Sequence, residues 1–462
     1  MMNRFLKKLY LAIVIPCALN LPVTLFWLTG IMIGDKFDYD FLELIVWLAA
    51  VFFLCAGTYL WILAGPVHDG GKTGLRVRMM MGGRRSVFWG LYGMAAQIFI
   101  ACIFSWTESG ILRAFGGGFW ISDMLLAVTG ILSLLGVGAL RIFFTSRRLS
   151  IVRRIVMLLT WWIPVVNLAV LLYVCRLVYE EYDFEREKAE LRALRVDSDL
   201  CATRYPLLLV HGIGFRDLRY FNYWGRIPLE LKRNGAVVYY GNQEALGTIA
   251  YNAEDIRKRI LQIREETGVE KVNIIAHSKG GLDARCAIST LGMSPFVASL
   301  TTMNTPHRGC RFVDYACRLP ESFYRFVAGC FDRTFARFGD KAPDFYTATR
   351  QFSTEASARF NEKTPDMPGV YYQSYTSKMK NPFSHLLLSI PYCMIRPLEG
   401  ENDGLVSVES AKWGEFRGVF SNKRLRGISH GDIIDLKRQD YKGFDVVETY
   451  VQIVAELKER GF

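Results

Sequence analysis

The chain has 462 residues, of which 51% are hydrophobic and 22% charged. This composition excludes a disordered chain and is more apolar than that of most soluble enzymes, so it predicts a membrane-embedded part. The net charge of +12 fits either a nucleic-acid partner or the cytoplasmic margin of a bilayer. Residues 1–178, the most apolar stretch, hold 16 basic and seven acidic residues. Most of the excess charge therefore lies with the apolar residues, which favours a membrane and argues against nucleic acid.

Five apolar runs occupy this N-terminal region, near residues 9–33, 41–63, 87–106, 119–144 and 155–179. Each has about the 20 residues that a helix needs to cross a bilayer. Five buried helices of a globular core are the less favoured alternative. No small-residue cleavage site follows the first run, so we expect it to be an anchor and not a signal peptide. The sequence thus predicts an all-α transmembrane region of about five helices over residues 1–179.

Basic residues in the connections between the runs predict an orientation. They cluster at residues 72–85 and 141–154, whereas Lys36 and Arg113 are the basic residues of the other two connections. The positive-inside rule therefore assigns the N-terminus and the two basic clusters to the cytoplasm. Five crossings then predict that everything after residue 179 is extracytoplasmic, and one span fewer would reverse that prediction.

Residues 180–204 begin with charges at helical spacing and are predicted to form a helical neck. Over residues 205–462, short apolar strands alternate with amphipathic helices. We expect strands at residues 207–210, 236–240, 272–276 and 300–303, a strand-like segment at 392–396, and helices at 253–267 and 444–457. Such alternation predicts an α/β fold with a mostly parallel sheet flanked by helices.

The strongest local signal is VNIIAHSKGGLDAR, residues 272–285. A buried strand runs into Ala276, Ser278 and Gly280, which fits the nucleophile elbow G-x-S-x-G with alanine for the first glycine. The sharp strand-to-helix turn strains the serine and requires small neighbours two positions away. The helix that follows points its unpaired N–H groups at the reaction centre. Ser278 is therefore the predicted nucleophile.

An earlier segment, PLLLVHGIGF at residues 206–215, predicts a second part of the same site. An apolar strand there runs into His-Gly-Ile-Gly, where hydrolases with such an elbow supply an oxyanion donor from a loop. We expect the backbone N–H groups of Ile213 and Lys279 to form the oxyanion hole. A turn of this kind is common after strands, so by itself it is a weak signal. The prediction depends on its position before the elbow segment, in the order found in such hydrolases.

A triad on this fold runs serine, acid, histidine along the chain. Three histidines follow Ser278. His307 is typical of a fixed structural turn, His385 lies among apolar residues, and His430 comes shortly before the final helix. His430 is therefore the preferred base.

The acid is expected in LEGENDGLV, residues 398–406. Asp403 lies between Asn and Gly, in turn chemistry that lets its carboxylate reach the Nδ1–H of His430. Glu399 and Glu401 are the alternatives, interpreted as surface acids. In the predicted mechanism the histidine takes the proton of Ser278, whose oxygen attacks an ester carbonyl, and water then releases the acyl group.

These segments and their order resemble the bacterial true lipases typified by the Pseudomonas and Burkholderia triacylglycerol lipases, over about residues 205–462. TTMNTPHRGCRFVDY, ENDGLVSVESAKWGEF and ISHGDIIDL also match. The resemblance implies an α/β-hydrolase fold, a triad of Ser278, Asp403 and His430, a lipid ester substrate and a mobile lid over about residues 311–360. The apolar runs, which lie outside this resemblance, predict a multi-pass protein of the cell membrane, and the resemblance to bacterial enzymes makes a bacterial plasma membrane the expected one.

The resemblance further implies a structural calcium site, which this sequence matches in part. Asp432 stands two residues after the base, as in the family, but residues 371–383 offer only Asn381 for the second acid. We therefore predict no required cofactor or metal. Cys310, Cys317 and Cys330 could form a bridge within the lid if the domain is extracytoplasmic, with no pairing fixed by their spacing.

Two other functions remain open at this stage. A phospholipase or lipid acyltransferase would use the same triad and acyl-enzyme. A non-catalytic lipid-binding scaffold or transporter would depend mainly on the apolar helices, although the scarcity of charge within them argues against ion transport. The expected partners are a lipid ester and the bilayer, without nucleic acid, and the sequence predicts no oligomeric state.

Overall fold

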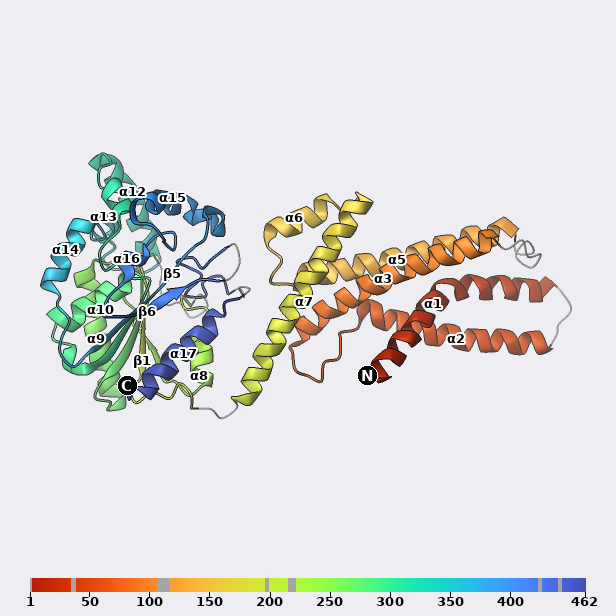
Figure 1. Ribbon diagram of the computed structural model, residues 1–462, viewed down its shortest axis with the longest axis horizontal. Coiled ribbons are helices and arrows are strands. Elements are labelled where there is room, and N and C mark those ends of the chain that lie inside the picture. The colour runs from red at the N-terminus through yellow and green to blue at the C-terminus, as the bar shows by residue number, and fades with distance from the viewer. Residues whose placement is uncertain are drawn as a thin grey trace. The chain divides into compact units, whose positions relative to one another are not determined.

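The computed structural model describes residues 2–34, 39–106, 116–195, 199–214, 222–422, 426–438 and 443–462. The chain forms two compact units, Met1–Val196 and Asp197–Phe462 (Figure 1). The first is built of helices, and the second contains the sheet. The finer boundaries expected from the sequence, with a neck over residues 180–204, remain a prediction.

The helices of the first unit are α1 (Met2–Gly34), α2 (Tyr39–Ala64), α3 (Leu75–Trp106), α5 (Gly116–Thr145), α6 (Ile151–Leu159) and α7 (Pro164–Leu194). Within the described residues, four segments are long and apolar enough to cross a membrane. These are Phe5–Thr29, Leu42–Ala64, Leu75–Ile103 and Gly117–Thr145. They correspond to the first four of the five predicted runs.

The fifth predicted span, at residues 155–179, is wrong. The chain turns at residues 160–163, after the nine-residue helix α6 and before α7. Pro164 lies at the start of α7, where its missing N–H and fixed φ suit the beginning of a helix and not its interior. α7 then continues to Leu194, so residues 180–194 of the predicted helical neck are helical and form the second half of this helix.

Close contact between α3 and α5 holds the first unit together. A Cβ atom added to Gly138 would lie 2.8 Å from the carbonyl oxygen of Gly83, and one added to Gly83 would lie 2.8 Å from that of Gly138. Ser86 donates its hydroxyl to the carbonyl of Leu134, 2.9 Å away. Small residues that let backbones approach are typical of helix packing in membranes.

Arginine side chains cap the end of α2. The Arg141 guanidinium donates to the carbonyl oxygens of Leu63 at 2.7 Å and Gly65 at 2.9 Å, and Arg85 donates to the same oxygen of Gly65 at 2.9 Å. The last carbonyls of a helix have no partner within it and carry a partial negative charge, which cations stabilise.

A buried carboxylate attaches α7 to α3 and to the loop after α5. Glu181 pairs with Arg76 at 2.6 Å and accepts the Ser146 hydroxyl at 2.7 Å and the Arg148 backbone N–H at 3.2 Å. Its side chain is 1% exposed. Such a burial is tolerated only because the charge is paired and hydrogen-bonded.

The second unit has a six-stranded, all-parallel sheet in the order β2-β1-β3-β4-β5-β6. The strands are β1 (Leu207–Val210), β2 (Val238–Tyr240), β3 (Val272–His277), β4 (Val297–Met303), β5 (Tyr371–Ser377) and β6 (Glu415–Phe420). α9 (Ile249–Thr267) and α10 (Lys279–Thr290) cover one face, and α8 (Ile227–Arg233) and α17 (Val446–Glu459) the other (Figure 1). The predicted α/β class is confirmed.

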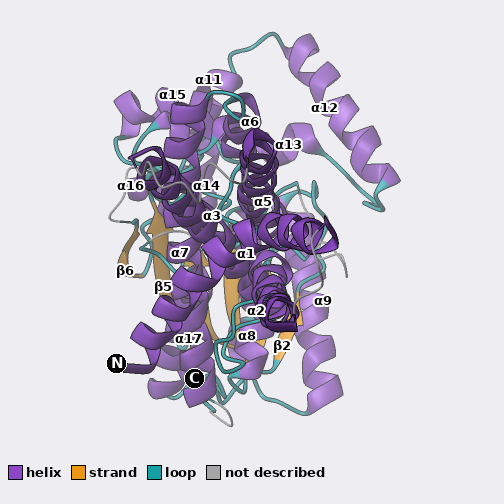
Figure 2. Ribbon diagram, turned by 90° about the vertical axis from the view of Figure 1, so that its right-hand side faces the viewer, coloured by secondary structure: helices purple, strands orange, loops and turns teal. Residues whose placement is uncertain are grey.

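Four helices lie between β4 and β5: α11 (Arg311–Ala316), α12 (Glu321–Arg337), α13 (Phe345–Arg350) and α14 (Thr354–Lys363). Figure 2 shows α12 standing out from the rest of this unit. The remaining elements are α15 (Ser389–Glu399), α16 (Val408–Ala411) and 3-10 turns at Ser294–Phe296, Pro382–Ser384 and Leu386–Leu388.

One predicted strand is wrong and two strands were not predicted. Residues 392–396 belong to helix α15, which buries Tyr392 and Ile395 at a helical spacing of three. β5 and β6 were not predicted because their sequences, YYQSYTS and EFRGVF, lack a clear apolar run. Polar groups satisfy each other in β5, where Gln373 donates to the Thr301 hydroxyl at 2.8 Å.

The contact between α3 and α5 leads to a test of the first unit. Gly138→Ala should destabilise it by roughly 1–3 kcal/mol, since the added methyl group meets backbone that cannot rotate away. The control is Gly136→Ala on the same helix, where the nearest atom to an added Cβ is 3.9 Å away. Thermal midpoints of the full-length protein in detergent would compare them, and equal midpoints would contradict this account of the packing.

Candidate active site

Ser278 occupies the sharp turn between β3 and α10. Its φ of 53° and ψ of −130° are a conformation that side chains rarely adopt. The serine is 8% exposed, while Ala276 and Gly280 on either side are buried. This is the strained strand-to-helix turn that the sequence predicts for a nucleophile elbow.

Glycines allow this turn because the backbone of β1 runs directly behind it. A Cβ on Gly280 would lie 2.7 Å from the carbonyl oxygen of Val210, and a Cβ on Gly212 would lie 2.8 Å from the Cβ of Ser278. Atoms at such distances would overlap, so neither position accepts a larger residue without moving the backbone. The glycines therefore allow the His-Gly-Ile-Gly loop and the elbow to pack directly against each other.

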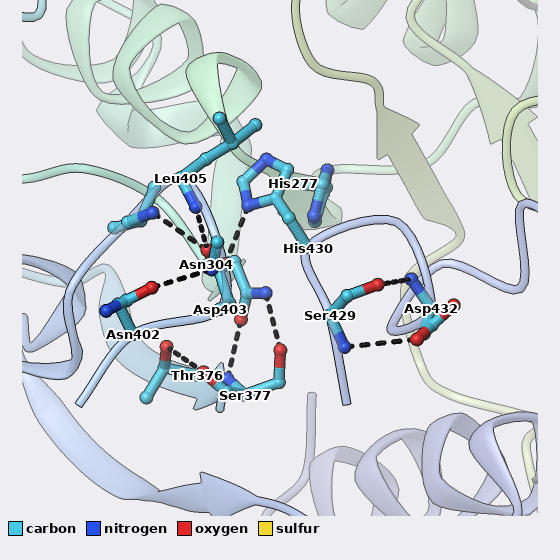
Figure 3. A network of polar contacts seen from close by, with 12 residues as sticks. His277, Asn304, Thr376, Ser377, Asn402, Asp403, Leu405, Ser429, His430 and Asp432 are labelled. Carbon is cyan, nitrogen blue, oxygen red and sulfur yellow. Dashed lines mark hydrogen bonds and ion pairs between the residues drawn. The ribbon is translucent and has the colours of Figure 1, made fainter. Parts of the chain in front are cut away.

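His430 and Asp403 meet across a loop (Figure 3). The His430 ring Nδ1 lies 2.7 Å from one carboxylate oxygen of Asp403. The other oxygen accepts the backbone N–H groups of Leu405 and Val406, both at 2.8 Å. Asp403 is fully buried and His430 is 8% exposed. The carboxylate is held on both sides, so it can fix the orientation and tautomer of the imidazole.

The alternative residues lie in other contacts. Glu399 accepts the backbone N–H of Arg311 at 2.7 Å, and Glu401 pairs with Lys378 at the surface. The buried ring of His307 stacks on Trp413 with centroids 5.2 Å apart. His385 is half-buried, and burial lowers its pKa. Of all the candidate acids and bases, Asp403 and His430 are the pair that the structure brings into contact.

Two further aromatic side chains support His430. The His277 ring packs against that of His430, with centroids 4.6 Å apart (Figure 3), and its Nδ1 lies 2.6 Å from the Tyr223 hydroxyl. Burial, and then the nearness of His430, hold the pKa of His277 well below its ordinary value. A neutral His277 places no positive charge beside the His430 ring. This pair was not predicted from the sequence, because within the elbow motif a role was assigned only to Ser278 and to the small residues around it.

An ion pair in α10, directly after the elbow, was also not predicted from the sequence. The Lys279 ammonium lies 2.6 Å from the Asp283 carboxylate, and both side chains are 1% exposed. Asn252 donates to the second carboxylate oxygen at 3.1 Å. Burial lowers the pKa of Lys279 and raises the pKa of Asp283, while their attraction opposes both shifts. The spacing of four residues on a helix was a signal for this pair.

An apolar cavity of about 350 Å³ opens beside Ser278 and His430. Ile213, whose backbone N–H is the second expected oxyanion donor, also lines the cavity. The Lys279 side chain points away to Asp283, which leaves its backbone N–H, in the first turn of α10, as the predicted donor. Most of the remaining wall comes from α11, α12 and α13, including Phe312, Val313, Phe323, Tyr324, Val327 and Phe345.

Comparisons with known proteins find hydrolases that are similar to this chain. A family model described as the alpha/beta hydrolase fold matches residues 205–388. Triacylglycerol lipase 2 of Saccharomyces cerevisiae is 29% identical over 270 residues, which cover 54% of this chain and 77% of that protein. A triacylglycerol lipase of Burkholderia plantarii is 30% identical over 213 residues, covering 42% of this chain and 59% of that protein. The chain is a carboxylic ester hydrolase of the α/β-hydrolase fold.

Among solved structures, the mature lipase BlEst2 of Bacillus licheniformis aligns with 55% of this hydrolase and 92% of its own chain, at 19% identity and a TM-score of 0.41. The resemblance to lipases noted in the sequence is confirmed by the family model and the curated relatives. The apolar helices lie outside the region that the family model matches.

The residues of the expected calcium site do not fit the ion in this hydrolase. One carboxylate oxygen of Asp432 lies 3.6 Å from the Lys437 ammonium, and the other accepts the backbone N–H of Ser429 at 3.2 Å. Calcium takes six to eight oxygen ligands, often several carboxylates, yet within the described residues no group of three acidic, histidine or cysteine side chains could hold a metal. The Lys437 ammonium already provides a positive charge beside Asp432.

All ten cysteines of the chain lie in the described residues, and none of them is part of a disulfide there. Cys310, Cys317 and Cys330 are thus not bridged, and the disulfide considered for the lid does not form. Burial raises the pKa of Cys310 well above its ordinary value, which disfavours its reactive thiolate. These helices are held by packing and hydrogen bonds instead.

The paired lysine leads to a prediction about metal removal. Ester hydrolysis by the hydrolase should be unchanged by excess EDTA, since Lys437 provides the positive charge at Asp432. Lys437→Met should lower the thermal midpoint because it leaves a buried carboxylate without its cation. Loss of activity in EDTA that added calcium restores would contradict this interpretation.

Proposed function

We propose that the chain is a membrane-anchored lipase that cleaves acylglycerols or related lipid esters through an acyl-enzyme on Ser278. The observation that carries this proposal is the Asp403–His430 hydrogen bond of 2.7 Å beside the strained serine, at the mouth of an apolar cavity. The triad roles of Ser278, Asp403 and His430 are part of the proposal.

The proposed mechanism begins with His430. Its Nδ1–H donates to Asp403, which leaves Nε2 as the base for the Ser278 hydroxyl proton. The serine oxygen then attacks the ester carbonyl, and the imidazolium returns the proton to the leaving alcohol. Water, activated by the same nitrogen, next attacks the acyl-enzyme, which releases the fatty acid and restores the serine.

Backbone N–H groups would stabilise the negative charge that develops on the carbonyl oxygen. We assign this role to Lys279, in the first turn of α10, and Ile213, in the loop after β1. Loss of one such donor typically costs about 3–4 kcal/mol of transition-state stabilisation. The buried Lys279–Asp283 pair supports the donor by fixing the first turn of α10.

The cavity supports a substrate with a hydrocarbon chain. Its wall is almost wholly apolar, with Ser278 and His430 at one end, so an acyl chain could lie along α11 and α12 with its carbonyl at the serine. The triacylglycerol lipases among the relatives support an acylglycerol. The exposed phenylalanines of α12, among them Phe323 and Phe326, support its proposed role in a lid over this cavity that meets a lipid surface.

Ser278→Ala should lower hydrolysis of a p-nitrophenyl ester at least a thousandfold and abolish fluorophosphonate labelling, because no nucleophile remains. Asp403→Asn should retain labelling but lower kcat by roughly a thousandfold or more, as the histidine loses its tautomer. Glu401→Gln, which changes a surface ion pair two residues away, is the matched control. Unchanged activity in Ser278→Ala would refute the mechanism.

We also propose that the four apolar helices anchor the chain in a cell membrane. The second unit, which carries the active site, then lies on the same side of that membrane as the N-terminus. The earlier expectation of an extracytoplasmic domain depended on five crossings, whereas four return the chain to its starting side. The basic clusters at residues 72–85 and 141–154 support a cytoplasmic assignment for that side.

A pair of fluorophosphonate probes would test this orientation. A charged, impermeant probe should label Ser278 only after cells are lysed, whereas a permeant probe should label it in intact cells. Ser278→Ala supplies the background in both cases. Labelling of intact cells by the impermeant probe would show that the hydrolase faces outward.

A further inference from the structure

The segment that follows α5 has apolar side chains on its outer surface. Six residues of α6 are 40–75% exposed: Ile151, Val152, Ile155, Val156, Leu158 and Leu159. Trp162 and Val165, in the turn and the first turn of α7, are 78% and 81% exposed. So much apolar surface on consecutive residues indicates an environment other than water.

The polar side of α6 faces inward. Met157 is buried in the core formed with α3, α5 and α7, and the neighbouring arginines turn to the preceding loop. Arg153 donates to the carbonyl of Arg148 at 2.8 Å, and Arg154 to that of Ser146 at 3.0 Å. Arginines that donate to backbone carbonyls of the preceding loop, with aliphatic groups outside, reverse the pattern of a water-soluble surface helix.

The element is too short to cross a bilayer. Nine residues of α helix extend only about 14 Å, less than half of a hydrocarbon core of about 30 Å. The chain then turns through Thr160–Trp161–Trp162–Ile163 and returns as α7, which contacts α6. Two adjacent tryptophans are typical of the boundary between headgroups and acyl chains.

Contacts of α7 define the level of this turn within the first unit. Arg84 donates to the carbonyl of Cys175 at 3.2 Å, and Leu171 packs in one core with Val87 and Ile142. These partners lie at the arginine-rich ends of α3 and α5, the ends that the positive-inside rule assigns to the cytoplasmic interface. Trp161 of the turn lies beside Gly136, since its ring is 3.9 Å from a Cβ added there, and Gly136 belongs to the half of α5 that is nearer the same end. The turn therefore lies in the half of these helices nearer that interface and not across the bilayer from it.

We infer that α6 and the first turns of α7 form a hairpin that lies in the membrane interface, with its apolar face among the acyl chains of the cytoplasmic leaflet. The occupant of this face is lipid, because the face continues the apolar surface of four helices that are themselves proposed to cross the membrane. Arg147 and Arg148 beside it suit anionic headgroups. The hairpin enters and leaves on one side, which accounts for an apolar run that adds no crossing.

This inference depends on the proposed membrane anchoring but not on ester hydrolysis, so its test uses lipid contact as the readout. A fluorescent amino acid would be introduced by stop-codon suppression at position 165, 162, 194 or 53 of the full-length chain in nanodiscs of phosphatidylcholine and phosphatidylglycerol. Quenching by nitroxide-labelled phosphatidylcholine reports lipid, and quenching by iodide reports water.

Leu194 is the matched control, because it lies on the same helix as Val165 and is 83% exposed but belongs to the charged end of α7. Phe53, 71% exposed on α2, reports the membrane spans. We expect positions 165, 162 and 53 to be quenched at least threefold more by the lipid nitroxide than position 194, and position 194 to be quenched by iodide.

Other outcomes would contradict either the hairpin or the anchoring. Lipid quenching at 53 with iodide quenching at 165 and 162 would overturn the hairpin and leave the anchoring intact. Quenching by neither agent at 165 and 162, with cross-linking between chains, would show that a second copy covers the face and would also overturn it. Iodide quenching at 53 would refute the anchoring itself, whatever the esterase activity of the same sample.

Discussion

The active site depends on one steric constraint, the close approach of the β1 and β3 ends at the turn that carries Ser278. The serine adopts a φ of 53° because β3 must reverse directly into α10, and there is room for this only because Gly212 and Gly280 have no side chain. A residue held in such a conformation costs of order 1–3 kcal/mol. Neighbouring strands of the parallel sheet and the buried Lys279–Asp283 pair hold the turn in place.

Hydrogen bonds hold several of the polar groups around this turn. Asp403 receives two backbone N–H groups in addition to His430. Asn304, at a φ of 51°, exchanges two hydrogen bonds with Ser377 at the end of β5, both 2.8 Å long (Figure 3). Hydrogen bonds between buried groups are strengthened by the low local dielectric and favour one arrangement of the chain. Backbone hydrogen bonds just after β5 tie down the loops of the acid and the histidine: Met379 N–H donates to the carbonyl of Asn402 at 2.9 Å, and Ile428 N–H donates to that of Lys378 at 2.8 Å.

Much of the second unit could be predicted, because its signals are local. β1 and the elbow are read from apolar runs that end in small residues, and Asp403 from an Asn-Asp-Gly turn. β5 and β6 could not be found, since polar side chains such as Gln373 are buried there by partners from distant segments. His277 and Tyr223 lie 54 residues apart, and no local pattern connects them. In the first unit, composition alone overestimated the spans, because mean hydropathy does not register a turn before Pro164.

The presence of an apolar helical unit and an ester hydrolase in one chain has a kinetic consequence. A lipase that partitions from solution must first adsorb to its substrate, and its rate follows its bulk concentration. If the four apolar helices keep this enzyme in a bilayer, as we propose, the relevant quantity becomes the mole fraction of substrate within that bilayer, and inert lipid acts as a diluent. Fatty acid and partial glyceride would be released into the same sheet of lipid, so product inhibition would be a property of the membrane and not of the surrounding solution.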